Sequence, residues 1–64
     1  MDNLTKEDIG EIVNYLQPDI LMGGEQKTYQ GIFINFDTEY KNLCYIKCKN
    51  GRVIIKNELQ VWRE

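Results

Sequence analysis

Hydrophobic residues near the start of the chain recur with the period of an α-helix. The apolar positions stand at i, i+3, i+4 and i+7, the spacing of one helix face: Ile9, Ile12, Val13 and Leu16. Thr5 and Asp8 have the spacing of a capping box at a helix N-terminus. Pro18 lacks a backbone N–H and is expected to end the helix. The pattern therefore predicts an amphipathic helix over about residues 5–16.

From Thr28 onward the hydrophobic period changes to two, which is typical of strands. The dipeptide Asn50-Gly51 between two alternating runs predicts a hairpin with a type I′ turn. The strands are expected at about residues 19–22, 27–36, 43–49, 52–56 and 59–63. Short turns leave no room for crossover helices, so the sheet should be antiparallel. So few strands bury an apolar face best by curling into a small barrel, here a single domain over residues 1–64.

The length and composition of the chain limit what it can do. A chain of 64 residues has a small core, so oligomerisation is an open possibility. With 8 basic and 10 acidic residues it lacks the broad positive field of a non-specific nucleic-acid binder. Cys44 and Cys48 would stand about 13 Å apart in a strand, beyond the reach of a disulfide. With no histidine, we expect neither a metal site nor a cofactor.

The sequence does not favour catalysis or a membrane location. Histidine and serine are both absent, and no glycine-rich phosphate loop or pair of carboxylates suited to acid/base chemistry is present. We therefore expect a non-enzymatic protein. The first residues lack a signal-peptide pattern, and no apolar run approaches about 20 residues. A soluble cytoplasmic protein without membrane contact is expected.

The second half of the chain resembles the Sm/Hfq-like small-barrel family. The first family signature is matched by Tyr29, Gly31, Phe36, Asp37, Asn42 and Leu43. The stretch of residues 53–62, VIIKNELQVW, resembles the second signature, so the match covers about residues 29–62. The resemblance implies an α+β, mainly β fold, in which an N-terminal helix precedes a four- or five-stranded antiparallel SH3-like (Sm-like) barrel. It also implies an RNA-binding, post-transcriptional regulator that assembles into homo-oligomeric rings.

Four residues take the RNA-contacting positions that the resemblance implies. Tyr40 would stack on a base of single-stranded RNA, and Asn42 would hydrogen-bond a base edge. Lys56 would supply the cationic contact, with Asn57 as its polar neighbour. As plain structural residues, Tyr40 would only cover the barrel mouth and Asn42 would only satisfy a turn.

The acidic balance of the chain supports an alternative from another functional class. Within the same fold family, the acidic inhibitors of the transcription terminator Rho (the Rof type) resemble this chain in the stretch NLCYIKCKNGRVIIKNEL. A protein of this type would occupy a basic groove on a nucleic-acid-binding partner, and four acids are the candidates: Glu7, Glu11, Asp37 and Glu39. RNA binding needs a basic patch instead, from Lys41, Lys47, Lys49, Arg52 and Lys56. Head-to-tail self-association between faces of opposite charge is a third possibility.

Overall fold

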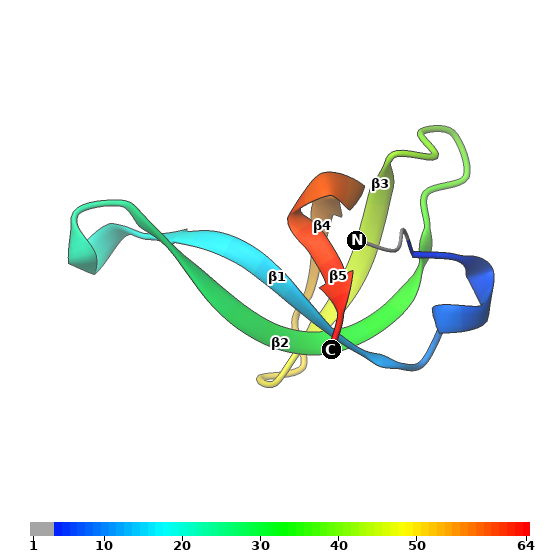
Figure 1. Cartoon of the computed structure of the whole chain (residues 1–64), viewed down its shortest axis with the longest axis horizontal. Helices are drawn as coiled ribbons and strands as arrows, with labels where there is room; N and C mark the ends of the chain where they lie inside the picture. The colour runs from blue at the N-terminus through cyan, green and yellow to red at the C-terminus, as the bar shows by residue number, and fades with distance from the viewer. Residues whose placement is uncertain (1–3) are drawn as a thin grey trace.

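The structure is a computed structural model that describes residues 4–64, and the fold is mainly β (Figure 1). Its strands are β1 (Ile12–Asp19), β2 (Glu25–Phe36), β3 (Leu43–Cys48), β4 (Val53–Asn57) and β5 (Val61–Arg63). They form one antiparallel sheet in the order β4-β3-β2-β1-β5. The strands therefore follow a meander, and β5 returns to pair with β1. The result is a small barrel-like fold.

The predicted N-terminal helix over residues 5–16 is wrong, and with it the α+β class. Within residues 4–64 the only helical elements are three 3₁₀ turns, η1 (Lys6–Asp8), η2 (Ile20–Met22) and η3 (Glu58–Gln60). The capping box of Thr5 and Asp8 does form, but it caps η1. Gly10 then adopts a φ of +89°, which a right-handed helix cannot contain. The chain enters β1 two residues later.

The alternation of β1 explains why the helical spacing was misleading. Val13 and Tyr15 are buried, whereas Ile12 is exposed and Asn14 is only half-buried. Pro18 is compatible with this strand because the outer part of β1 pairs with β2 alone and needs no donor on its other edge. The segment 20–22, expected within a first short strand, forms η2 at the end of the hairpin instead.

The β1–β2 hairpin serves two roles along its length. Its inner part belongs to the barrel, because β5 pairs with residues 13–15 of β1 and β3 pairs with residues 31–36 of β2. Its outer part, residues 16–28, pairs only across the hairpin and projects from the other strands as an arm (Figure 1). The register between β2 and β3 shifts between Phe33 and Asn35, a β-bulge that bends β2 into the barrel.

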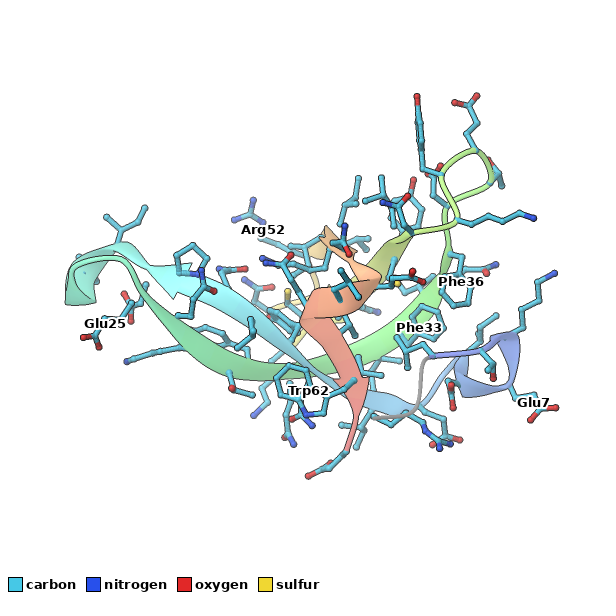
Figure 2. All side chains as sticks on the ribbon, turned by 45° about the horizontal axis from the view of Figure 1, so that its top comes forward. Glu7, Glu25, Phe33, Phe36, Arg52 and Trp62 are labelled. Carbon is cyan, nitrogen blue, oxygen red and sulfur yellow. The ribbon has the colours of Figure 1, made fainter. Side chains whose placement is uncertain are left out.

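The core lies between the curled strands. Its buried members come from the N-terminal segment and from four strands: Leu4, Val13, Tyr15, Phe33, Cys44, Ile46 and Val61. The ring of Phe33 meets that of Phe36 edge to face at 5.0 Å, and both lie inside the curve of β2 (Figure 2). Gly31 is the one core position where β2 approaches a neighbour too closely for a side chain, with Ile46 and the Lys47 carbonyl against it.

The hairpin between β3 and β4 forms at Asn50-Gly51, but its turn is not of type I′. That turn requires positive φ at both central residues, and within the described chain only glycines have positive φ. Gly51 has a φ of +89° and donates its N–H to the Cys48 carbonyl. The Asn50 side-chain oxygen accepts a hydrogen bond from the Arg52 N–H at 2.9 Å. The turn is thus longer than predicted, and it presents its side chains beside the arm.

Candidate nucleic-acid interface

An open groove lies between the arm and the β3–β4 turn, and we call it the tyrosine groove. Eleven residues line it: Asn14, Tyr15, Gln17, Thr28, Tyr29, Gln30, Cys48, Lys49, Asn50, Arg52 and Ile54. Its volume is about 930 Å³, near the upper end of the range for ligand pockets. Its lining combines amide, aromatic and cationic side chains, and none of the lining residues among positions 4–64 is acidic.

Two stacked tyrosines form the floor of the tyrosine groove. Tyr15 and Tyr29 are cross-strand partners on β1 and β2, which places their side chains on the same face of the sheet. Their ring centroids are 5.8 Å apart and the planes are inclined by 24°. Tyr15 is buried, whereas Tyr29 keeps 38% of its surface exposed. Tyr29 is therefore an aromatic surface held in place by Tyr15 and still open to a flat ligand.

The Tyr15 hydroxyl is fixed at the inner end of this stack. It lies 3.3 Å from the Sγ atom of Cys48 on β3, within hydrogen-bond distance. Burial, followed by the interaction with Cys48, raises the pKa of Tyr15 to about 12. The phenol is thus neutral at physiological pH, and the groove floor carries no negative charge from this group.

The positive charge of the tyrosine groove comes from the β3–β4 turn. Lys49 and Arg52 both line the groove, and neither forms an ion pair within residues 4–64. The turn fixes their backbones, because the Cys48 N–H donates to the Arg52 carbonyl at 2.7 Å. In Figure 2 the Arg52 side chain extends from the turn toward the arm. Two uncompensated cations beside an aromatic surface suit a polyanion that carries flat rings.

The four residues that the family resemblance selects lie on two adjoining segments. The Asn42 carbonyl accepts a hydrogen bond from the Glu58 N–H at 2.8 Å, so the loop of residues 37–42 lies beside the end of β4. Lys56 is half-buried opposite Cys44, and the Asn57 side chain caps η3 by accepting from the Leu59 N–H. Tyr40 is 61% exposed on the same loop. The hollow at this loop has mixed charge, with Lys6, Lys41, Asp37 and Glu58 in its lining.

Asp37 organises the loop that carries Tyr40. The Tyr45 hydroxyl and the backbone amides of Tyr40 and Glu39 donate hydrogen bonds to its carboxylate, and they hold its pKa below the ordinary value. Every one of these bonds is made within the loop and the adjoining strand. Asp37 therefore stabilises the loop conformation, whichever partner the loop contacts.

The remaining acids selected for partner binding are divided between two places. Glu7 and Glu11 line an open hollow together with Asp8, Trp62, Arg63 and Glu64, whereas Glu39 is exposed on the loop of residues 37–42. Figure 2 shows Glu7 on the N-terminal segment, away from Arg52. The Asp8 carboxylate is buried and accepts from Arg63 at 3.1 Å. The structure thus gathers Glu7 and Glu11 at one surface but does not bring all four acids together.

Sequence reasoning did not select Tyr15 or Tyr29 as binding residues. Lys49 and Arg52 belonged to the basic patch required for RNA binding, but their aromatic neighbours were missed. Tyr15 fell in the predicted helix, where it could not face Tyr29. The available signal was the alternation of Val13 and Tyr15, which fits a strand.

Comparisons of the chain with family models, curated proteins and solved structures found no match. Membership of the Sm/Hfq-like family therefore stays a prediction. Among residues 4–64, no group of three or more histidines, cysteines, aspartates or glutamates is placed to hold a metal ion. No helix in this part of the chain is long and apolar enough to cross a membrane.

Proposed function

We propose that this chain is a non-enzymatic module that binds single-stranded RNA in the tyrosine groove. The observation that carries the proposal is the stacked Tyr15–Tyr29 pair beside Lys49 and Arg52. Neither cation forms an ion pair within residues 4–64, and no carboxylate from this part of the chain lines the groove. The resemblance to Sm/Hfq-like proteins supports a role in post-transcriptional regulation in the cytoplasm. The ring assembly that it implies stays a prediction.

Each group in the groove has a distinct part in binding. A base unstacked from the RNA lies on the open face of Tyr29, where stacking contributes about 1–3 kcal/mol. Lys49 and Arg52 contact the phosphates on either side of that base. Gln17 lines the groove on the same face of β1 as Tyr15. Its amide offers both donors and an acceptor to base edges, which are accessible only in a single strand. Tyr40, Asn42, Lys56 and Asn57 provide a second contact for a longer RNA.

The proposal is tested by fluorescence anisotropy with a labelled, mixed-sequence single-stranded RNA of about twelve nucleotides. Loss of the stacking contact in Tyr29→Ala should weaken binding between about 5-fold and about 150-fold. Lys49→Ala and Arg52→Ala should each reduce the slope of log K against log salt by about 0.7. Lys27→Ala is the matched control, because Lys27 is exposed and lies outside both the tyrosine groove and the hollow at the loop of residues 37–42.

Two results would contradict the proposal. One is the absence of binding at low salt by a protein whose circular dichroism shows it to be folded. The other is binding that Tyr29→Ala leaves unchanged. If Tyr40→Ala weakens binding while Tyr29→Ala does not, the loop is the RNA site and the tyrosine groove is not.

The hollow around Trp62 supports a second candidate function, the docking of a basic segment of another protein. Glu7 and Glu11 line this hollow beside the indole of Trp62, so charge and an aromatic surface coincide there as well. Titration with a lysine- and arginine-rich peptide tests it, with Glu7→Gln and Glu11→Gln expected to weaken binding. Binding that persists unchanged in the double variant would exclude this candidate.

A further inference from the structure

The tip of the arm exposes two large aliphatic side chains. Ile20 is 88% exposed and Leu21 is 95% exposed, more than any other large hydrophobic residue of the described chain. Both belong to η2, the segment that joins β1 to β2 at the far end of the arm (Figure 1). Isolated exposed hydrophobic residues are ordinary, but an adjacent pair at the end of a projecting hairpin indicates a contact surface.

The tip is also held in one conformation. The Asp19 carboxylate accepts a hydrogen bond from the Leu21 N–H at 3.0 Å, and the Asp19 carbonyl accepts from the Gly24 N–H at 2.9 Å. Gly23 and Gly24 adopt φ angles of +76° and +83°, which close the turn. A partner would therefore meet a preformed tip, and little conformational entropy would be lost on docking.

A second exposed surface with apolar residues lies on the barrel of the same chain. Register places one residue from each of four strands in a cross-strand row, which we call the outer row: Ile12, Ile32, Lys47 and Val53. All four are exposed, and the first three line a shallow hollow of about 350 Å³. Among the described residues, its lining includes Lys47 and Lys49 and no acid. Lys47 forms no ion pair within residues 4–64.

The charges beside the tip complement those of the outer row. Asp19 and Glu25 are cross-strand partners at the base of the tip, and Lys27 neutralises only Asp19, at 3.2 Å. The tip is thus apolar with a net negative rim. At the outer row, Lys47 and Lys49 line the hollow with Ile32, whereas Ile12 at the other end also lines the acidic hollow of Glu7 and Glu11. Because both surfaces occur once on each chain, copies can join head to tail.

We propose that the tip of one copy docks on the outer row of a second copy, with Ile20 and Leu21 covering Ile12 and Ile32. The carboxylate of Glu25 then lies near Lys47 of the second copy. This contact differs from pairing between the sheet edges β4 and β5. The hollow at the outer row shares Gln30, Cys48 and Lys49 with the tyrosine groove, but the proposal does not require RNA to bind there.

The test uses light scattering on purified full-length protein over a wide concentration range. The wild-type mass should rise with concentration. Leu21→Asp in the tip and Lys47→Glu in the outer row should each weaken association at least about tenfold, the effect of losing one buried aliphatic side chain or one charge pair. Leu59→Asp is the matched control, because Leu59 is an exposed leucine in η3 and lies outside the tip and the outer row.

Mixing the two variants separates this contact from other modes of association. Leu21→Asp retains an intact outer row and Lys47→Glu retains an intact tip, so their mixture should form a 1:1 dimer that grows no further. Circular dichroism establishes that each variant is folded, and Ile32→Asp provides a second outer-row variant. A monomeric wild type, an assembly unaffected by Leu21→Asp, or a mixture that stays monomeric would overturn the proposal. Binding of wild type to phosphatidylcholine vesicles that Leu21→Asp abolishes, without self-association, would assign the tip to a membrane instead.

Discussion

Gly31→Ala should destabilise the fold because β2 meets β3 too closely there for a methyl group. A Cβ atom at this position would lie 2.6 Å from Cγ2 of Ile46 and 2.8 Å from the carbonyl oxygen of Lys47. The Ile46 methyl could rotate away, but the Lys47 carbonyl belongs to the backbone of β3. Relief of the second contact requires the two paired strands to separate.

The expected cost follows from these two contacts. Overpacking of a core position costs about 1–3 kcal/mol, and the backbone contact places Gly31→Ala in the upper part of that range. Replacing glycine also reduces the conformational entropy of the unfolded chain, which offsets about 0.5 kcal/mol of this loss of stability. The net loss is about 2 kcal/mol, from a total of about 3–10 kcal/mol for a chain of this size. At about 4–8 °C per kcal/mol, Tm should fall by about 8–16 °C.

Thermal unfolding followed by circular dichroism, together with urea titration, measures this change. Gln26→Ala is the control, since Gln26 is exposed on the arm portion of the same strand and should change stability by less than about 0.5 kcal/mol. If Gly31→Ala is as stable as wild type, the close approach of β2 and β3 at this point is not real. The curvature inferred for β2 would then have to be abandoned as well.

Other parts of the core and its ionisable groups give further expectations. Phe33→Ala should cost about 3–5 kcal/mol and leave the chain largely unfolded, as judged by amide chemical-shift dispersion. Because the folded state holds the Tyr15 proton more tightly, its contribution to stability is complete below pH 10 and is lost as the pH rises through about 12. A Tyr15→Phe variant should lack this loss in unfolding measurements across the same range. Burial raises the pKa of Cys44 to about 11, so iodoacetamide at neutral pH should leave it unmodified until the protein unfolds, as mass spectrometry would show. Asp8→Ala should cost about 2 kcal/mol in urea titration, because it removes the buried acceptor of Arg63 and of the Thr5 N–H, whereas exposed Glu7→Ala should cost little.

The N-terminal segment shows how local signals can be correct while the element is wrong. The capping box of Thr5 and Asp8 is a short-range interaction, and it forms as the sequence predicts. Whether a helix follows depends on tertiary contacts, because a short isolated helix is only marginally stable. Here two backbone hydrogen bonds join residues 10–11 to Phe33. The Gly10 N–H donates to the Phe33 carbonyl, and the Phe33 N–H donates to the Glu11 carbonyl. Those bonds join the segment to β2, and no helical spacing in the sequence reveals them.

The candidate site was less predictable than the strands for a related reason. Lys49 and Arg52 lie in the β3–β4 turn, and the dipeptide Asn50-Gly51 predicts this hairpin from the sequence. The Tyr15–Tyr29 stack depends on the register between β1 and β2, and the mistaken helix removed β1 from consideration. The exposed tip was missed in the same way, because residues 20–22 were expected to be in a strand rather than in the turn that presents Ile20 and Leu21.

The measurement that tests RNA binding in the tyrosine groove most directly is a titration of ¹⁵N-labelled protein with single-stranded RNA, followed by NMR. We expect the largest changes in amide chemical shift at Tyr29, Lys49 and Arg52, and we expect these changes to saturate with one RNA site. Changes confined to the surface around Glu11 and Trp62, or no change at any RNA concentration, would contradict this expectation.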